Sequence, residues 1–433
     1  MKDSDFPGKV IIESATIYNS LNTNSIINNL LSVDIYEDIY TPYVYCEILI
    51  IDYNKLASSL PLMGEEFFQI RFKTSEGQFI SYTFYLYQQD NGAIMSNNKA
   101  QGYSLHGVTL ERAFDAAKTV SRSYKGPYAK IAGQIYDDFI KKDIGLEFEY
   151  EPSKSIVRYI VPQLSPLEAI NYCKKKAVSN SGVYSPYTFF RNARGLHFVS
   201  FNSLFQMAGN ARENVIHIFG NSSSNPTSEN EEIVGGNRTR TDIISFEPNS
   251  KYNSVNKIDR GTYNSSSYSF DLTTKQYVLR KQYNLKDNKN KFQLGNSGEF
   301  NSEQFLDTFK DTRCYVEYMP TDFSIELEGT QTDFYSDAIG EMNSYLGLFG
   351  QQEVSILMYG DSNLTSGHVL TVGVYKPTDQ NIIPEFDQTL SGNYLIARIK
   401  HSLIIGTQNT YELHITGIKG AMGDTLRGLQ KNG

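Results

Sequence analysis

Two pairs of acidic side chains have the type and spacing that carboxylate chemistry uses. Glu65 and Glu66 are adjacent. Neighbours in a strand point to opposite faces, so these two cannot flank one scissile bond. Glu326 and Glu328 can share a face, but Glu328-Gly329 has the pattern of a strand end. We therefore expect a solvent-exposed edge there rather than an acid–base pair.

Two histidines near the end of the chain are the best candidates for metal ligands. His401 and His414 are predicted to lie near register across a terminal hairpin. Two imidazoles need a third ligand to seat a metal ion, and the sequence places none nearby. A cross-strand polar pair is the favoured interpretation.

Catalytic motifs are missing from the sequence. It has no Gly-x-Ser-x-Gly, Walker loop, His-Glu-x-x-His or Cys-x-x-Cys. Cys46, Cys173 and Cys314 are far apart and odd in number, so neither a disulfide framework nor a clustered metal site is indicated. The sequence predicts a protein that is not an enzyme, with no catalytic, cofactor-binding or metal-binding residues and no cofactor.

Length and charge narrow the class further. A chain of 433 residues suggests about three domains. No apolar run approaches the ~20 residues of a spanning helix, and no signal peptide is recognisable, so we expect no membrane anchor and a reducing cytoplasm. The net charge of -8 argues against binding nucleic acid by phosphate neutralisation. The run Lys174-Lys-Lys176 is interpreted as a solvated helix face.

The stretch Tyr359–Met422 shows short alternating runs separated by Gly, Ser, Asn and Thr, which is a strand pattern. Within Tyr394–Ile404 the alternation predicts one buried and one exposed face. The expected buried face consists of Leu395, Ala397, Ile399, His401 and Leu403, and the exposed face of Arg398, Lys400 and Ser402. The turn Gly406–Asn409 leads into a last strand, Tyr411–Ile418.

The N-terminal region also consists of strands. Runs rich in Ile, Val, Phe and Tyr alternate with Asn, Pro, Gly and Ser, which predicts one barrel or sandwich over residues 9 to 110. The predicted strands are Lys9–Tyr18, Ser32–Ile39, Tyr43–Tyr53, Glu66–Lys73 and Phe79–Gln88.

The middle of the chain differs in kind. An amphipathic helix is predicted after Pro127, with Gly145 past its end. Ser165-Pro-Leu-Glu168 is a capping box that starts a helix running to about Ser179. The segment Tyr187–Ser200 follows as a hairpin with its turn at Asn192–Gly195, so this region is a small α/β unit.

The rest of the chain is less regular. The polar segment Gly220–Arg240 is predicted to be a mobile, protease-sensitive loop. Strands are expected at Asp242–Phe246 and Tyr252–Ile258, and Arg260–Thr332 carries weak signals. A helix is predicted after Asp333 and should end near glycines. Its apolar stripe would comprise Phe334, Ala338, Met342 and Leu346.

Several of these patterns together resemble one protein family. They are Gly367-His-Val-Leu-Thr-Val-Gly-Val, Ser391-Gly-Asn-Tyr-Leu-Ile-Ala-Arg-Ile-Lys-His401, Leu60-Pro-Leu-Met-Gly-Glu-Glu-Phe-Phe-Gln-Ile-Arg-Phe72 and Ser81-Tyr-Thr-Phe-Tyr-Leu-Tyr87. They resemble the tube-like barrels of phage tail hub proteins. This family comprises the central baseplate hub of T-even-like contractile phages and its relatives, late control protein D and the N-terminal part of VgrG. The helix, helix, hairpin order of the middle unit is similar to the unit between those barrels.

The resemblance implies an α+β, mainly β fold with two related antiparallel tube-like β-barrel domains, an α/β domain between them and an insertion in the second barrel. The implied domains are 1–111 (first barrel), 112–205 (α/β domain), 206–258 with 350–422 (second barrel), 259–349 (insertion with a helix near 333–347) and 423–433 (tail).

The implied function is that of a structural hub in a contractile tail baseplate, located in the virion and made in the host cytoplasm. Its expected partners are two further copies in a homotrimer, a trimeric spike protein, tail tube or tube-initiator proteins and possibly wedge proteins, with DNA passing through unbound. The alternatives are a receptor-binding or adhesin-type β protein and a cell-wall hydrolase. The absence of Trp disfavours sugar stacking, and no fibrous repeat precedes a head.

The two barrel patterns also echo each other. Gly64 and Gly367 each open an alternating strand, and an aromatic-aliphatic strand follows after a loop. We expect both glycines to lie at matching places where a Cβ is unfavourable. Three such duplicated chains would form a pseudo-six-fold ring.

Overall fold

The structure of the chain is a computed structural model in which strands predominate over helices. The described residues are 8–20, 22–52, 62–90, 101–180, 184–204, 216–219, 243–250, 254–271, 275–288, 308, 313–319, 324–326, 334–348, 352–376, 386–387 and 390–419. The predicted loop Gly220–Arg240, Glu328 and the tail 423–433 lie outside them.

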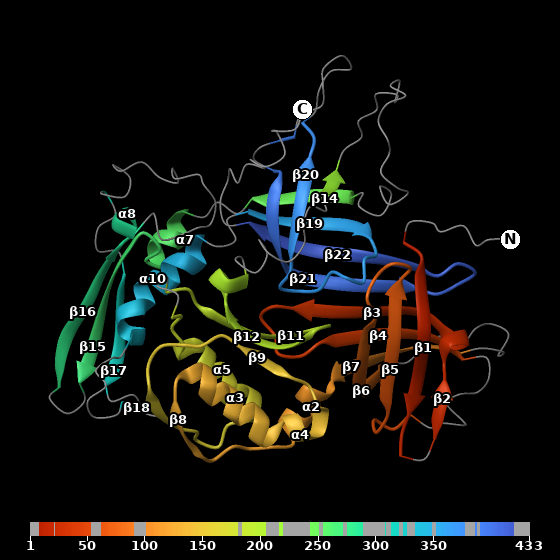
Figure 1. Cartoon of the computed structure of the whole chain (residues 1–433), viewed down its shortest axis with the longest axis horizontal. Coiled ribbons are helices and arrows are strands. Elements are labelled where there is room, and N and C mark those ends of the chain that lie inside the picture. Colours follow the sequence, from red (N-terminus) through yellow and green to blue (C-terminus); the bar gives the residue numbers. More distant parts are fainter. Residues whose placement is uncertain are drawn as a thin grey trace.

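A sheet of 13 strands runs through the molecule (Figure 1). Its N-terminal strands are β1 (Val10–Tyr18), β2 (Thr23–Ser25), β3 (Leu30–Asp38), β4 (Tyr45–Asp52), β5 (Phe67–Thr74), β6 (Ile80–Asp90) and β7 (Gln101–Thr109). Its C-terminal strands are β13 (Ile216–Phe219), β14 (Ile243–Ser250), β19 (Gln352–Tyr359), β20 (Val369–Val374), β21 (Gly392–Ile404) and β22 (Thr410–Lys419). The strands predicted between residues 9 and 88 are all present with small shifts at their ends, whereas β2 and β7 were not predicted individually.

The two halves of this sheet share one strand order. In the N-terminal half β1 pairs with β5, β5 with β6, β6 with β7, β7 with β4, and β4 with β3. In the C-terminal half β13 pairs with β20, β20 with β21, β21 with β22, β22 with β19, and β19 with β14. Chain order therefore matches β1 with β13, β3 with β14, β4 with β19, β5 with β20, β6 with β21 and β7 with β22. The first pairing differs in direction, because β1–β5 is antiparallel and β13–β20 is parallel.

The two halves also match in strand register and in the position of a β-bulge. Leu86 in β6 pairs with a glycine of β7 directly before a β-bulge, and Ile396 in β21 does the same with a glycine of β22. The amides of both residues also donate to the segment before the preceding strand, at 3.0 and 2.8 Å. The matched positions are Leu86 and Ile396, Gly107 and Gly417, and Glu66 and His368. Such bulges re-aim a strand, so both halves bend at the same place.

The two predicted glycines lie before matching strands. Gly64 precedes β5 with φ +89°, and Gly367 precedes β20 with φ +84°. When the two halves are aligned by their strand registers, the two glycines fall at neighbouring positions rather than at the same position. A Cβ on Gly367 would meet Cζ of Phe190 at 2.7 Å, whereas one on Gly64 has open space. Both positions therefore favour glycine for its backbone freedom, and Gly367 also for space.

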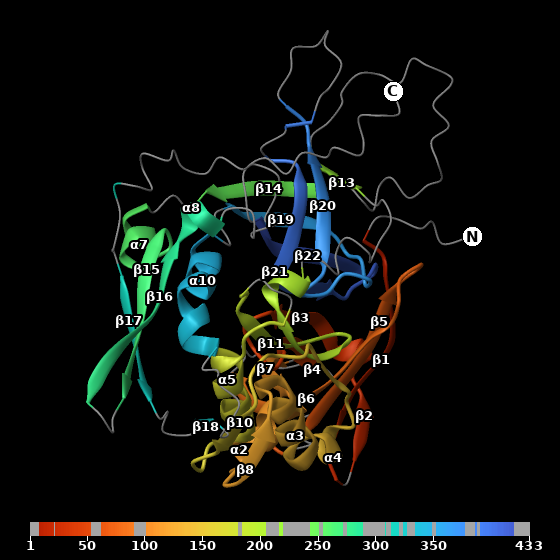
Figure 2. The same ribbon diagram turned by 60° about the vertical axis from the view of Figure 1, so that its left-hand side comes forward.

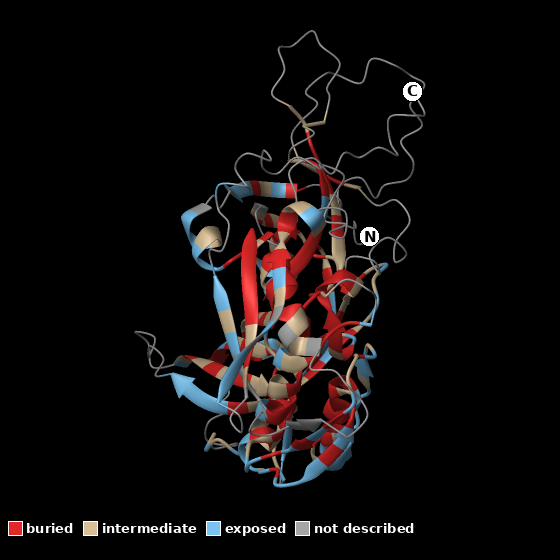
Figure 3. Cartoon of the chain, turned by 90° about the vertical axis from the view of Figure 1, so that its left-hand side faces the viewer, coloured by how far each residue is buried: buried red, intermediate tan, exposed pale blue. Residues whose placement is uncertain are grey.

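The halves are joined into one body rather than standing as separate barrels. Strand β3 pairs with β21, which makes the backbone ladder continuous across the junction. One hydrophobic cluster includes Ile17 and Phe84 from the N-terminal half and Ile356 and Leu413 from the C-terminal half. Fully burying such a side chain contributes about 1.5–3 kcal/mol, so the two halves stabilise each other. Figure 3 shows this buried interior between exposed outer surfaces.

The middle unit has the predicted order of elements. It contains α2 (Leu110–Ala116), β8 (Ser123–Gly126), α3 (Tyr128–Phe139), α4 (Lys141–Ile144), β9 (Phe148–Tyr150), β10 (Val157–Ile160), α5 (Pro166–Lys176), β11 (Tyr187–Asn192) and β12 (Gly195–Ser200). The capping box is confirmed, because the Ser165 side chain accepts from the Glu168 amide and the Glu168 carboxylate accepts from the Ser165 amide. Helix α5 ends at Lys176, before the predicted Ser179. The single helix predicted after Pro127 is divided at Ile140 into α3 and α4, and Gly145 follows the end of α4, as predicted, at positive φ.

The insertion is a second small α/β layer beside the large sheet (Figure 2). It contains α7 (Ser254–Asp259), β15 (Asn264–Asp271), β16 (Gln276–Asn284), α8 (Leu285–Asn288), β17 (Cys314–Met319) and α10 (Phe334–Leu348). The intervening strand β18 (Ser324–Glu326) pairs with β10 of the middle unit instead. The predicted strand Tyr252–Ile258 is wrong, because Ser254 begins a helix. Seven residues of apolar and polar alternation do not distinguish a strand from about two helical turns.

Helix α10 lies where it was predicted, but its buried stripe differs in part. Ala338 and Met342 are buried as expected, whereas Leu346 is 44% exposed. The stripe continues through Tyr345 and Leu348 instead. These two positions maintain the helical spacing toward β15 and β16, which α10 contacts.

The bulge in β21 also corrects the predicted faces of that strand. Ile399, His401 and Leu403 lie on the buried face as expected. Leu395 and Ala397 precede the shift and pack in a different cluster, next to the insertion. A strict alternation cannot anticipate this, because one extra residue moves every earlier side chain to the other face.

Candidate functional site

The sequence-predicted candidates do not converge in the structure. Glu66 is buried, and its carboxylate accepts from the amides of Met63, Gly64 and Glu65 at 2.9–3.2 Å. It therefore holds the turn before β5. Glu326 ends β18 and pairs with Val157 of β10 in a separate three-stranded sheet, whereas both histidines lie in the large sheet. No acid–base pair is formed by these carboxylates among the described residues.

The two histidines are not a cross-strand pair. In the register of β21 and β22, His401 lies opposite Leu413 and His414 opposite Lys400. His401 is fully buried, whereas His414 lies on the opposite, open face of the sheet. The predicted pair is wrong because adjacent register positions point to opposite faces.

A buried polar cluster around Glu37 occupies the junction between the two halves. One carboxylate oxygen accepts from the Tyr82 hydroxyl at 2.6 Å and lies 3.3 Å from Nε2 of His401. The other accepts from the Thr365 hydroxyl and from the Ser366 amide at 2.8 Å. These partners come from β6, β21 and the segment before β20, so one side chain of β3 binds both halves.

The cluster extends to β22, and hydrogen-bond partners surround its carboxylate. Nδ1 of His401 lies 2.6 Å from the Tyr411 hydroxyl. Burial alone would raise the pKa of Glu37, but the His401 contact and the Thr365 and Tyr82 hydroxyls outweigh it and lower the pKa to about 2. Burial raises the pKa of Tyr82 and Tyr411 well above the ordinary value. An ionised carboxylate among donors, with no exposed surface, stabilises structure rather than acting on a substrate.

A second buried ion pair ties the middle unit to the same place. Nε of Arg191 in β11 lies 3.0 Å from Oε1 of Glu111 in α2, and both side chains are almost fully buried. The next residue, Asn192, donates to the Ser366 carbonyl at 2.8 Å. The segment before β20 is therefore held from one side by β3 and from the other by the hairpin of the middle unit. Removing one partner of such a buried pair is costly.

Glu37 was missed by sequence reasoning, although a signal is present. In the run Ser32–Ile39 the alternate residues Val33, Ile35 and Ile39 are fully buried. Glu37 occupies the same parity as these residues and therefore has to be buried with them. A charged residue on an apolar face needs partners, and these come from segments far away in sequence.

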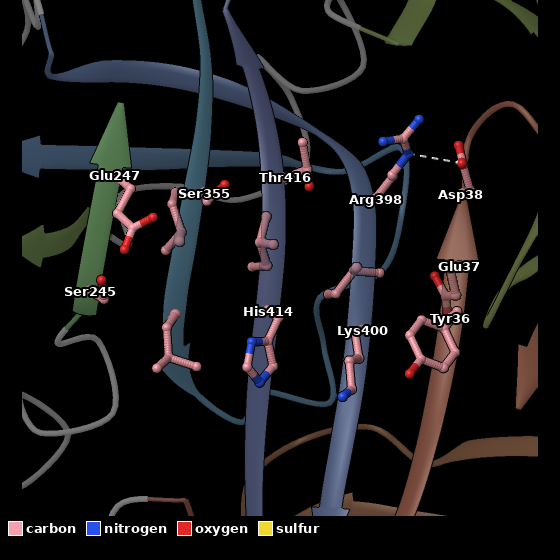
Figure 4. A pocket seen from close by; sticks show the side chains of 14 residues that line it. Tyr36, Glu37, Asp38, Ser245, Glu247, Ser355, Arg398, Lys400, His414 and Thr416 are labelled. Atoms are coloured by element: carbon pink, nitrogen blue, oxygen red, sulfur yellow. Dashed lines mark hydrogen bonds and ion pairs between the residues drawn. The ribbon is translucent and has the colours of Figure 1, made fainter. Parts of the chain in front are cut away.

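The opposite face of the sheet is open and polar. The C-terminal strands, from β14 to β21, and the adjoining β3 surround a shallow pocket of about 600 Å³ on this face (Figure 4). We call it the open face; the register continues it across β4, β7 and the end of β6. The side chains directed there include Asp34, Tyr36, Asp38, Glu47, Asp90, His106, Ser245, Glu247, Ser355, Arg398, Lys400, Glu412, His414 and Thr416.

Ion pairs cross the junction on the open face. Nε of Arg398 lies 3.0 Å from Oδ2 of Asp38, and Nζ of Lys400 lies 2.8 Å from Oδ2 of Asp34. Burial would lower the pKa of Lys400, but the bonded carboxylate outweighs it and raises the pKa. The remaining carboxylates outnumber these two cations, so the open face is acidic. Among the described residues of this face, Lys and Arg do not form a cluster that could bind phosphate.

Within the described ranges, no group of His, Cys, Asp and Glu is arranged to hold a metal ion. A search of the same ranges finds no helix of the length and apolarity that a membrane span requires.

Two solved structures of tail proteins have a similar fold. The tail protein from Neisseria meningitidis MC58 matches 95% of this chain and 98% of its own length, with a TM-score of 0.52 and 9% identity. The 43 kDa tail protein of prophage MuSo2 from Shewanella oneidensis matches 95% of this chain and 100% of its own length, with a TM-score of 0.50 and 10% identity. The mainly β fold with large antiparallel sheets is therefore shared with these two tail proteins.

A weaker likeness extends to secretion systems. The E. coli c3393 protein, a component of the type VI secretion system, is covered over 79% of its length at 10% identity, with a TM-score of 0.44. That score is too low to support the fold assignment. No family model and no curated protein sequence matches the chain.

Proposed function

We propose that this chain is the central hub of a contractile tail baseplate and that three copies form a closed ring. The observation that carries the proposal is the repeated strand order, with matching registers and bulges in both halves. The fold shared with two tail proteins, one of them from a prophage, supports a structural role in a tail.

Symmetry explains why such a chain suits a hub. A tail tube is six-fold and a central spike is three-fold, so the protein between them must present both kinds of contact. Three copies of a chain with two like halves present six similar surfaces on one side and three identical ones on the other. A chain with one such half would offer the tube only three docking surfaces.

The open face is the proposed wall of the channel. The other face of the sheet is filled by the hydrophobic core, so only the open face can meet water. Its excess of carboxylates repels a polyanion, which lets DNA pass without being held. We expect no retention of double-stranded DNA in a gel-shift at low salt; tight retention would contradict a conduit role.

The partners follow from this position. We propose contacts with a trimeric spike below, a tail tube or tube initiator above and possibly wedge proteins outside. The protein would be made in the host cytoplasm and would be located in the tail baseplate of the virion.

Light scattering of the purified chain tests the proposal. A mass of about three times the 49.0 kDa of one chain is expected. A single-chain mass at high concentration would remove the main support for the hub and favour a monomeric tail protein.

A further inference from the structure

The junction between the two halves shows how a strand of one half extends the sheet of the other. Strand β21 pairs with β20 through residues Gly392–Leu395, and after its bulge it pairs with β3 through Arg398–Ile404. The edge that β20 leaves free is thus taken by β3. Strand β3 is the last strand of its own half and extends the sheet into the other half.

The N-terminal half has a corresponding sheet edge at the end of β6. Strand β5 pairs with β6 only as far as Tyr85, and after the bulge the residues Gln88–Asp90 pair with β7 alone. In the described part of the chain no strand lies on their other side. The register matches Asp90 with Lys400, so this edge corresponds to the part of β21 that β3 occupies.

The C-terminal half has the complementary unused strand. In the part of the chain that the structure describes, β14 matches β3 and ends the sheet, where it pairs only with β19. Both strands carry a bulge at the same register position, between Leu30 and Ser32 and between Ile243 and Ser245. Pro248 lacks an amide hydrogen, a feature of edge strands. It removes at most one backbone bond from a pairing there.

We propose that β14 of one copy pairs with the end of β6 of a second copy, in the register that β3 and β21 use within the chain. Tyr36 lies opposite Lys400 in that register, so Asn249 would lie opposite Asp90 of the neighbouring copy. The pairing repeats head to tail and closes after three copies. This inference rests on the proposed ring and names the edges that form it.

The turn before β5 fits this arrangement. In the C-terminal half the matching turn is bound across the junction by Glu37 of β3. The residue of β14 that matches Glu37 is Ser250, which has no carboxylate to offer. In the N-terminal half Glu66 binds the turn from its own strand instead. Each turn therefore has one carboxylate, and no second one from β14 is needed.

The two junctions differ in charge. Within the chain, Lys400 pairs with Asp34 across the junction at 2.8 Å. The matching positions between copies are Asp90 and Glu247, which have the same sign. Asp90 is held by Nε2 of His106 at 2.8 Å instead. The junction between copies should therefore be weaker than the one within the chain, and a cation at position 247 should strengthen it.

Paired cysteines test the register. In a Cys314→Ser background, Asp90→Cys with Asn249→Cys places two thiols directly opposite across the proposed junction, within disulfide reach. Tyr36→Cys with Lys400→Cys is the matched control within the chain. Asp90→Cys with Glu247→Cys is out of register. Mild oxidation should link three chains through the 90/249 pair, with little linkage through 90/247.

The outcomes separate this inference from the proposed ring. If the Tyr36→Cys and Lys400→Cys control links and light scattering gives a trimer, absence of 90/249 linkage overturns the junction alone. A single-chain mass without linkage overturns the ring as well. Glu247→Lys should lower the concentration at which the trimer dissociates by about two- to fivefold for each exposed charge pair gained. An unchanged or higher value contradicts the proposed placement of Asp90.

Discussion

Removal of the Glu37 carboxylate should loosen the contact between the two halves of the sheet. In Glu37→Ala the Tyr82 hydroxyl and His401 lose their shared acceptor, and the Thr365 hydroxyl and Ser366 amide lose theirs. All of these groups are deep in the protein, where water cannot replace the lost bonds. The segment before β20 then loses its bonds to β3 but keeps its bond to the middle unit and the bonds of Ser362 and Asn363 to Thr74 and Gln78.

The magnitude follows from these contacts. Leaving one buried donor without its charged acceptor costs about 1–3 kcal/mol, so the loss of several such bonds in Glu37→Ala should cost at least about 3 kcal/mol. Glu37→Gln retains the shape and one acceptor oxygen for the Ser366 amide, so about 1–3 kcal/mol is expected. Glu47→Ala is the matched control, because Glu47 lies half-buried on the open face of the neighbouring strand β4. Its cost should stay within about 0.5 kcal/mol.

Urea unfolding at pH 7, combined with peptide-resolved hydrogen exchange, measures these effects. Exchange should increase first around residues 362–368 in Glu37→Ala, because that segment loses its acceptor. A free energy of unfolding within about 0.5 kcal/mol of the Glu47→Ala control would refute the role of Glu37 as a clamp.

The same group predicts a pH dependence. The folded pKa of Glu37 is lowered to about 2 from its ordinary 4.5. Its contribution to stability is therefore present above about pH 4.5 and is lost as the pH falls toward 2. The difference between the wild type and Glu37→Gln should shrink over that window. A difference that stays constant from pH 7 to pH 2.5 would contradict the assignment.

Three further substitutions probe other parts of the fold. Gly367→Ala should cost more than Gly64→Ala in thermal melting, since both have positive φ but only the former meets a side chain at 2.7 Å, and equal costs would contradict this reading. Arg191→Ala should destabilise by about 3–5 kcal/mol in urea unfolding and the double variant with Glu111→Leu by less, so a costlier double variant would count against it. Ser165→Ala should lower stability by about 1 kcal/mol through loss of the capping box, and an unchanged melting temperature would argue otherwise.

Local patterns predicted the elements well. The capping box at Ser165, the hairpin turn at Asn192–Gly195 and the strands of residues 9 to 88 depend on neighbours in sequence, and all are present. The strand Tyr252–Ile258 failed because a short apolar pattern suits both periods. The stripe of α10 was correct at Ala338 and wrong at Leu346, because the stripe of a straight helix drifts from a strict four-residue spacing.

Features that depend on contacts between distant parts of the sequence could not be predicted from local patterns. The bulge at Ala397 depends on how β21 meets both β20 and β3, which are far apart in sequence. The partners of Glu37 come from β6, β21 and the segment before β20, so the sequence showed only a charged residue on an apolar strand face. The echo of Gly64 and Gly367 pointed to a repeated unit. The pairing of β3 with β21, which fuses the two units, emerges only in three dimensions.

Electron-microscopic class averages of the purified protein test the central claim most directly. Two like halves in each of three chains predict a closed ring with an open channel, six similar lobes and strict three-fold symmetry. Single compact particles with the mass of one chain, or open filaments from a junction that does not close, would contradict it.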